Sequence, residues 1–477
     1  MRVRLIALAT ALLVAGTSAI TAAPPAVAAD DIERLAGADR YATSVEVSQA
    51  MPVGGVAYLA SGLDFPDALA AAPVAAAEDG RLLLVRPEEI PPPVAAELRR
   101  VAPREVVLVG STATLSAQLE AAVRGLLPGT PVTRIGGSDR VETSLLLLDR
   151  LRQSKPVASV WVVSGLGFAD ALTAGAVAAR LGHGLILATG DGARLSQLLA
   201  SRMSGIERFA IAGSPSSVSA GVADRLRATG RAIERFGGHD RYDTALLINQ
   251  RFTTSSPSRT MLLASGENFP DGLAGSVLAG RTSVPMYLTP QRCAPDDAVL
   301  GETRRLGIQA TRVLGDAHSV SAAAAALVPC TALTEAADAL LALINDARAD
   351  AGSDPVDPSP SPSAPPAAPL PPLATDACLA RMAGGWAATM AAEGLSGAAH
   401  NPQLTAEARE CGLRGWGENV GRTWGTPEPD VDRIMAAWMA SPGHRANILR
   451  ESFTHIGIGV ARGTNGSWYY VLDFGRR

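Results

Sequence analysis

The side chains best suited to chemistry gather near the C-terminal end of the chain. Three of the six histidines, His400, His444 and His455, lie late in the sequence, each inside a short polar motif. Glu418 lies between the first two, in a Gly-Glu-Asn-Val motif. Imidazoles and a carboxylate brought together could ligate zinc or supply general acid and base groups. The alternative is that His444 and His455 only satisfy backbone hydrogen bonds in turns.

Other kinds of chemistry find less support in the sequence. No Ser-His-Asp or Cys-His arrangement stands out, and the recurring Ser-Gly motifs have no base beside them, so nucleophilic catalysis is not indicated. The Gly-Gly-Ser-Asp-Arg stretch at 136–140 is neither a P-loop nor a dinucleotide fingerprint. The formal net charge is −4, and no basic face indicates nucleic-acid binding.

Most of the chain is one module written three times. A Ser-Gly-x-x-Phe-x-Asp motif begins at Ser61, Ser164 and Ser265, so the period is about 100 residues. An Arg-x-x-Gly-x-Asp-Arg motif precedes each copy, and an apolar run ending in glycine follows it. Solenoid repeats are only about 20–50 residues long, so each copy is expected to be a small domain.

The apolar pattern within each module predicts alternating strands and helices. Short unbroken apolar runs, such as 56–60, 82–85 and 106–109, are typical of strands in a parallel sheet that is covered on both faces. Alanine-rich segments such as 68–77 are expected to be the intervening helices. The order strand, turn, helix, strand predicts a doubly wound α/β fold.

The aspartates of the repeated motifs are interpreted as helix caps rather than ligands. Asp39, Asp139 and Asp240 each precede a helical stretch, and Asp67 lies just before the helical run of the first module. A carboxylate at such a position accepts hydrogen bonds from the first N–H groups of the helix.

These motifs in triplicate resemble the cell wall binding repeat 2 family of Gram-positive surface proteins. The resemblance covers residues 31 to about 330. It implies three Rossmann-like parallel-sheet modules in a pseudo-threefold arrangement, which hold a protein non-covalently on anionic wall polymers or peptidoglycan-associated glycopolymers. Ala169 replaces the proline of the motif in the second copy and Gly272 the alanine in the third, and neither change removes a charged group.

Arg40, Arg140 and Arg241 are the candidate polymer-binding residues of these modules. Strand-to-helix turns present N–H groups and the positive end of a helix dipole, and a guanidinium can bind a phosphate through two hydrogen bonds. An arginine beside an aspartate can equally be a structural ion pair, and both interpretations stay open. Three weak sites along one polymer would gain through avidity.

The N-terminal stretch 1–28 has the pattern of a secretion signal. Arg2 and Arg4 precede an apolar run, and an Ala-Val-Ala motif ends at position 28. An uncleaved anchor would need a longer apolar run, and no second stretch is long enough to span a membrane. We therefore expect an exported protein with no membrane span after cleavage. The three repeats are expected at 29–130, 131–231 and 232–330.

Four cysteines fit an oxidising compartment. Among the three connectivities, we favour pairing within each domain, as Cys293–Cys330 and Cys378–Cys411. Each disulfide would close a loop of about 35 residues and stabilise by roughly 3–4 kcal/mol. No CxxC or Cys/His spacing indicates structural zinc.

The motifs around the late histidines resemble the CAP superfamily (cysteine-rich secretory, antigen 5, pathogenesis-related 1) in its bacterial form. Residues 343–349, Leu-Ile-Asn-Asp-Ala-Arg-Ala, are similar to the first helix of that family. The CAP domain is therefore expected over 331–477, with the Pro-rich run near 355–372 as an insertion within it. The resemblance implies an α-β-α sandwich with a cleft where two histidines and two glutamates gather, sometimes around a divalent metal.

By motif, His400, Glu418 and His455 match three of these four positions and are the candidate catalytic residues. His400 and His455 are the candidate metal ligands. The position of the second glutamate holds Ser441, a departure that weakens both metal binding and hydrolysis.

We therefore expect a secreted surface protein that three repeats hold on the wall and that displays a CAP domain. The alternative is a wall-tethered peptidase or peptidoglycan hydrolase acting through the His/Glu cleft. Capture of a lipid or another small ligand by the CAP domain is a third hypothesis, for which the sequence holds no decisive signal.

Overall fold

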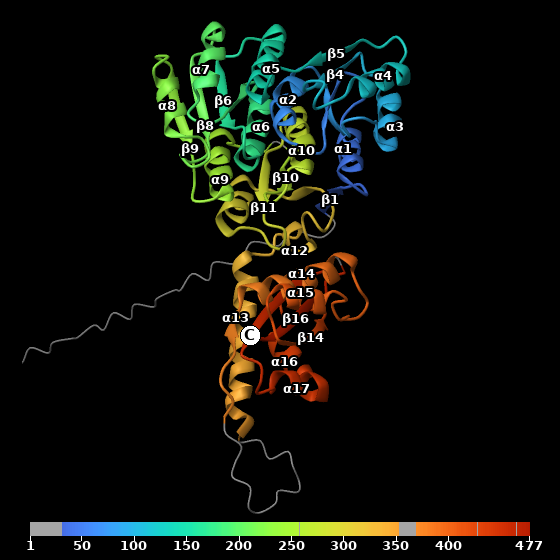
Figure 1. Ribbon diagram of the computed structural model, residues 1–477, viewed down its shortest axis with the longest axis vertical. Coiled ribbons are helices and arrows are strands. Elements are labelled where there is room, and N and C mark those ends of the chain that lie inside the picture. Colours follow the sequence, from blue (N-terminus) through green and yellow to red (C-terminus); the bar gives the residue numbers. More distant parts are fainter. Residues whose placement is uncertain (1–30, 257, 353–368, 427, 464) are drawn as a thin grey trace, which may run out of the picture.

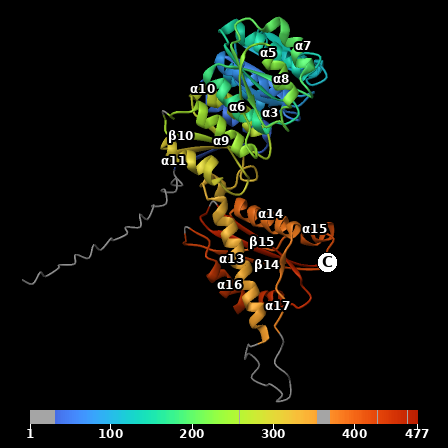
Figure 2. The ribbon, with the colours of Figure 1, turned by 90° about the vertical axis from the view of Figure 1, so that its left-hand side faces the viewer.

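The computed structural model describes residues 31–256, 258–352, 369–426, 428–463 and 465–477. The expected signal peptide and most of the expected Pro-rich insertion lie outside the described residues. Two bodies are visible in Figure 1, one formed by the first two thirds of the chain and one by the rest. The helix α13 (Cys330–Ala349) leads from the first body into the second and runs along one side of the second (Figure 2).

The first body contains three four-stranded parallel sheets. The first sheet has the order β3-β2-β4-β5, with β2 (Val56–Ser61), β3 (Arg81–Val85), β4 (Glu105–Val109) and β5 (Val132–Ile135). The second has the order β7-β6-β8-β9, with β6 (Ser159–Ser164), β7 (Gly184–Ala188), β8 (Arg208–Ala212) and β9 (Ala232–Phe236). The third has the order β11-β10-β12-β1, with β10 (Thr260–Ser265), β11 (Met286–Thr289), β12 (Ala310–Leu314) and β1 (Ile32–Leu35).

The outer strand of each sheet is exchanged between consecutive repeats, because the strand that opens one repeat motif pairs with the sheet before it. In the third sheet this strand is β1, which comes from the start of the chain and pairs with β12, Leu35 opposite Leu314. Arg34, the first residue of the repeated arginine motif, donates to the carbonyl oxygens of Gly315 at 2.6 Å and Val320 at 2.9 Å. The N-terminal strand thus closes the three modules into a ring.

The same arginine position makes the same bonds in the other two sheets. Arg134 donates to the carbonyl oxygen of Gly110 at 3.0 Å, and Arg235 donates to that of Gly213 at 2.7 Å. This role explains why the arginine of the motif recurs with the glycine at the strand end. Both residues belong to one long-range contact.

Helices cover these sheets and also form the centre of the ring. Their bounds are α1 (Arg40–Gln49), α2 (Pro66–Ala77), α3 (Pro92–Val101), α4 (Ala117–Leu126), α5 (Arg140–Ser154), α6 (Ala169–Leu181), α7 (Ala193–Leu199), α8 (Ala220–Arg227), α9 (Arg241–Phe252), α10 (Pro270–Thr282), α11 (Glu302–Leu306) and α12 (Ala322–Ala325). Helices α2, α6 and α10 pack on one another. A Cβ added at Gly280 of α10 would lie 2.6 Å from the Cβ of Ala179 in α6 and 2.7 Å from that of Ala76 in α2. Small residues therefore permit the pseudo-threefold packing, and the predicted α/β ring is confirmed.

The caps of the helices follow the sequence prediction with one exception. The carboxylates of Asp39, Asp139 and Asp240 accept backbone N–H bonds from the first turns of α1, α5 and α9, as expected. Asp67 was expected to cap α2, but this helix begins at Pro66 and Asp67 lies in its first turn. Its carboxylate instead accepts from the hydroxyl of Thr114 at 3.4 Å. Burial raises the pKa of Asp67, and hydrogen bonds from Thr143 of the next repeat and from Thr114 oppose this rise.

The second body is an α-β-α sandwich, as predicted. Its sheet has the order β13-β15-β16-β14, with β13 (Ala374–Thr375), β14 (Gly415–Thr423), β15 (His455–Arg462) and β16 (Trp468–Arg476). Helix α14 (Ala377–Glu393) covers one face, with α15 (Leu404–Glu410) beside it, while α13, α16 (Val431–Ala440) and α17 (Pro442–Ile448) cover the other. In the described part of the chain, no helix combines the length and the apolar composition that a membrane span requires.

The two bodies share an apolar joint. Ala323 of α12 and Val328 belong to the same buried cluster as Leu340 of α13 and Val460 of β15. The predicted disulfides are confirmed as Cys293–Cys330 and Cys378–Cys411. The first of them connects the loop after β11 to the first residue of α13, so it crosses this joint.

Candidate functional site

A histidine and a glutamate form a close pair at the edge of the second body. Glu418 lies on the edge strand β14, and His400 lies in the connection between α14 and α15. The Nδ1 atom of His400 is 2.6 Å from Oε1 of Glu418. The side chain of Glu418 is 1% exposed and that of His400 is 65% exposed. A buried carboxylate thus holds an imidazole that solvent can reach.

The carboxylate of Glu418 is further anchored by the neighbouring backbone. The Asn401 N–H donates to Oε1 at 3.1 Å. Burial raises the pKa of Glu418, while the hydrogen bonds from His400 and Asn401 lower it. In the tautomer with its proton on Nδ1, the imidazole would donate to an ionised Glu418 and keep a lone pair on Nε2, which is the arrangement of an oriented general base.

A second carboxyl group lies directly beside Glu418 inside the sheet. Asp473 of β16 is the cross-strand partner of Glu418 and is 0% exposed. Within the described residues neither of its carboxyl oxygens has a hydrogen-bond partner. Burial, followed by the charges of Glu418 and Glu407, raises the pKa of Asp473 to about 8. At neutral pH this carboxyl is therefore mostly protonated and uncharged.

His444, in α17, lies close enough to the pair for the charge of His400 to act on it. Its backbone carbonyl accepts from Nδ2 of Asn419 at 3.0 Å, and Asn447 donates to the Glu418 carbonyl at 3.2 Å. Burial lowers the pKa of His444, and the charge of His400 lowers it further. These hydrogen bonds from asparagine side chains connect α17 to β14. The Pro-Gly-His-Arg-Ala-Asn stretch therefore helps to position the strand that carries Glu418.

His455, the third residue of the expected cleft, lies apart from this pair. It opens β15, which β16 separates from β14, and it pairs with Gly475, whereas Glu418 pairs with Asp473. Two strand spacings and this offset place the Cα atoms of His455 and Glu418 roughly 12 Å apart. Nδ1 of His455 lies 2.8 Å from the hydroxyl of Thr454. The structure therefore brings His400 and Glu418 together and does not bring His455 to them.

The site does not fit the divalent metal that the CAP resemblance implies. Zinc sites use three or four protein ligands. In the described part of the chain, no group of three or more His, Cys, Asp or Glu side chains is arranged to hold a metal ion. His400 and His455, the expected ligands, lie on different segments with different partners, and we derive no chemical step through a metal.

The three candidate polymer-binding arginines of the ring donate hydrogen bonds to backbone carbonyl oxygens. Nη1 of Arg40 donates to the Gly62 carbonyl at 2.7 Å, and the equivalent arginines make the same bond to Gly165 and Gly266. Arg140 is also 3.9 Å from Asp64, a long ion pair at a partly exposed position. One nitrogen makes the carbonyl bond, and a guanidinium has five N–H donors. An arginine of this kind can therefore hold the loop in place and also bind a phosphate through its other N–H groups.

The three arginines surround one end of the ring axis. The rings of Phe65, Phe168 and Phe269, which precede the central helices, lie with their centroids 5.7–5.8 Å apart. Arg40 lies over Phe269 and Arg241 over Phe168. An aromatic cluster with two guanidinium groups over its rings thus occupies this end of the ring.

Comparison with known proteins gives matches to both bodies. The Cell wall binding domain 2 (CWB2) family matches residues 34–120, 134–223 and 235–325, and the cysteine-rich secretory protein (CAP) family matches residues 341–474. The N-acetylmuramoyl-L-alanine amidase LytC of Bacillus subtilis is 26% identical over 268 residues, which are 56% of this chain and 52% of that protein.

Two solved structures from Clostridium difficile resemble this chain over more than half of its length. The match to Cwp6 has a TM-score of 0.56 at 25% identity, and it covers 62% of this chain and 48% of the Cwp6 chain. The match to Cwp8 has a TM-score of 0.53 at 26% identity, and it covers 61% of this chain and 50% of the Cwp8 chain. The chain thus spans about half the length of these relatives.

Proposed function

Because the chain belongs to the cell wall binding domain 2 family and ends in a CAP domain, we propose that it is exported and held non-covalently on anionic polymers of a Gram-positive cell wall. Wall-binding repeats followed by a CAP domain fit a cell-wall-anchored surface protein. We place the wall-binding part before about residue 330 and the displayed CAP domain after it. Cleavage after residue 28 would leave β1 free to close the ring.

The observation that carries this proposal is the arginine-ringed end of the threefold axis. Arg40 and Arg241 lie over rings of one aromatic cluster, and Arg140, the equivalent residue of the second repeat, lies 3.9 Å from Asp64, which precedes Phe65 in the sequence. A phosphate-bearing polymer that passes over this end would meet the same donor set three times. Repetition of a weak contact raises the overall affinity through effective concentration.

The direct test exchanges these three arginines in the full mature chain. Glutamine at Arg40, Arg140 and Arg241 is expected to reduce co-sedimentation with purified walls and to weaken its salt dependence. The matched control carries three glutamines at Arg99, Arg231 and Arg304, which are exposed elsewhere on the ring. Equal loss of wall binding in both triple variants would mean that only net charge matters. Retention in the first variant would refute the site.

A wall-tethered hydrolase is the second candidate, and the His400–Glu418 pair favours it. An imidazole held by a buried carboxylate can activate water or a hydroxyl group. Turnover of purified peptidoglycan that disappears in Glu418→Gln and persists in Glu451→Gln, an exposed control, would support this function. No release of peptides or sugars from walls by the full chain would leave the CAP domain with a binding role.

A further inference from the structure

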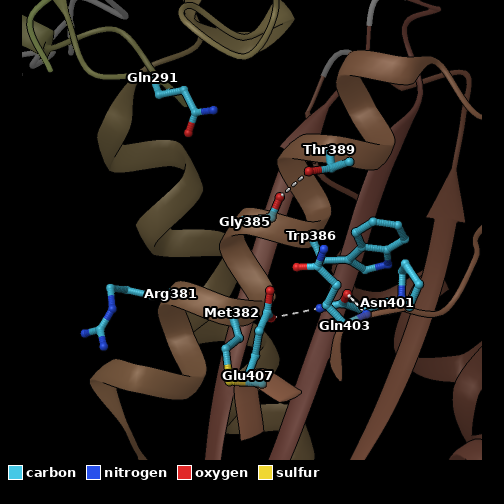
Figure 3. Close-up of a pocket in the computed structure, with 10 residues that line it drawn as sticks. Gln291, Arg381, Met382, Gly385, Trp386, Thr389, Asn401, Gln403 and Glu407 are labelled. Carbon is cyan, nitrogen blue, oxygen red and sulfur yellow. Dashed lines mark hydrogen bonds between the residues drawn. The ribbon is translucent and has the colours of Figure 1, made fainter. Parts of the chain in front are cut away.

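A pocket of about 520 Å³ lies at the joint between the ring and the CAP domain (Figure 3). One side is the outer surface of α14, with Arg381 and Trp386, and another is the start of α15, with Gln403 and Glu407. The third module contributes Gln291, from the loop after β11. The volume lies in the range of small-molecule sites, and the lining comes from two domains.

The lining of this pocket is polar and carries balanced charge. Arg381 supplies one cation and Glu407 one anion, while Gln291, Gln403 and Asn401 supply amides. Figure 3 shows the Asn401 amide and the Glu407 carboxylate joined by a hydrogen bond, which is 3.0 Å long. Carboxylates and primary amides both accept hydrogen bonds, and the amides also donate, so the set suits a ligand rich in hydroxyl groups.

The single aromatic residue of the lining is Trp386. Its indole N–H donates to the carbonyl of Ala399 at 2.7 Å, which fixes the ring, and the side chain remains partly exposed. A fixed, partly exposed indole offers an apolar face beside polar groups. The C–H face of a sugar ring has matching chemistry, because its hydroxyl groups point outward and its axial hydrogens form an apolar patch.

The contribution of the third module is fixed in place. The side-chain amide of Gln291 donates to the His318 carbonyl at 2.8 Å. The next residue, Arg292, lies against α14, where a Cβ added at Gly384 would overlap its guanidinium. Cys293 is held to the first residue of α13 by its disulfide. These contacts determine how the ring closes one side of the pocket.

We propose that this pocket binds a neutral oligosaccharide, with one sugar ring against Trp386 and hydroxyl groups hydrogen-bonded by Gln403, Glu407 and Gln291. Paired opposite charges give no net attraction for the anionic polymer assigned to the ring, and the polar lining is unsuited to a lipid chain. Asn401 also donates its backbone N–H to Glu418. Asn401 therefore lies between a glycan in the pocket and the His400–Glu418 pair.

The test is saturation-transfer NMR with the full mature chain and chitotetraose, a neutral oligosaccharide. We expect saturable binding that Trp386→Ala and Gln403→Ala each weaken about tenfold, as loss of a stacked ring or of hydrogen bonds would do. The matched control is Trp424→Ala, because Trp424 is 58% exposed on the same domain but outside the pocket. Trp386→Phe, which keeps an aromatic face, is expected to restore most of the affinity.

Gln291→Ala tests whether the third module takes part, and an affinity loss is expected although the residue is outside the CAP domain. Binding that survives Trp386→Ala and Gln403→Ala, or that falls equally in Trp424→Ala, would overturn the proposal. No detectable chitotetraose binding by a folded chain, or preferential binding of a soluble glycerol-phosphate oligomer in this pocket, would do the same. Wall anchoring is scored separately by sedimentation, so failure of one proposal leaves the other intact.

Discussion

Replacing Asp473 by asparagine should change how the stability of the CAP domain depends on pH. The carboxyl is 0% exposed, and its pKa is raised from 3.8 to about 8 by burial and then by the charges of Glu418 and Glu407. Because the folded state holds this proton more tightly than the unfolded state, the contribution to stability is fully present below pH 3.8. It is lost as the pH rises through about 8.

The size of the effect follows from proton linkage. One group that is protonated when folded and ionised when unfolded changes the free energy of unfolding by about 1.4 kcal/mol for each pH unit. An asparagine side chain cannot ionise, so the cost of the substitution itself is constant with pH. The stability difference between the wild type and Asp473→Asn should therefore shift in favour of the variant by several kcal/mol between pH 4.5 and 7.5.

Urea unfolding followed by tryptophan fluorescence is a suitable assay, because five of the six tryptophans lie in the CAP domain. The control is Asp338→Asn, which makes the same chemical change at an exposed aspartate on α13. The reasoning is refuted if Asp473→Asn and the wild type keep the same stability difference at pH 4.5 and 7.5. It is also refuted if the variant becomes less stable relative to the wild type as the pH rises.

The remaining predictions concern the ring and the joint. Gly280→Val should destabilise the ring by about 1–3 kcal/mol, because the new side chain would overlap α2 and α6, and urea unfolding followed by far-ultraviolet circular dichroism measures this. Serine at Cys293 and Cys330 should lower the free energy of unfolding by about 3–4 kcal/mol, because the unfolded chain loses the constraint of this disulfide, and urea unfolding of the variant beside the wild type under oxidising conditions measures the difference. Arg34→Ala should lower the free energy of unfolding by about 1–3 kcal/mol, because it removes two hydrogen bonds from the side chain to backbone carbonyls. Faster amide hydrogen exchange in β12 would show that β1 is held less tightly.

The modules of the ring were predictable because their signals are local. Unbroken apolar runs gave the strands, and the aspartates before α1, α5 and α9 gave the caps. The exchange of the outer strands was not predictable from the same patterns. Arg34 contacts a carbonyl 281 residues away, and nothing in its immediate neighbours indicates that partner. Asp67 was misassigned for the same reason, since its partners include a threonine of the next repeat.

The candidate site was predictable only where a motif carried it. The motifs selected His400 and Glu418, and in the structure Nδ1 of His400 lies 2.6 Å from Oε1 of Glu418. Asp473 was missed because a single acid within an apolar strand has no period or spacing of its own. Only the register of β14 against β16 places it opposite Glu418. The same register determines that His455, although on a neighbouring part of the sheet, stays apart from the pair.

The measurement that tests the central claim most directly is sedimentation of the full mature protein with purified Gram-positive walls, before and after chemical removal of their anionic polymers. Anchoring by the arginine-ringed end of the three modules predicts that the protein pellets with intact walls, is released as the salt concentration rises, and stays in the supernatant with stripped walls. Equal pelleting with intact and stripped walls would contradict the account.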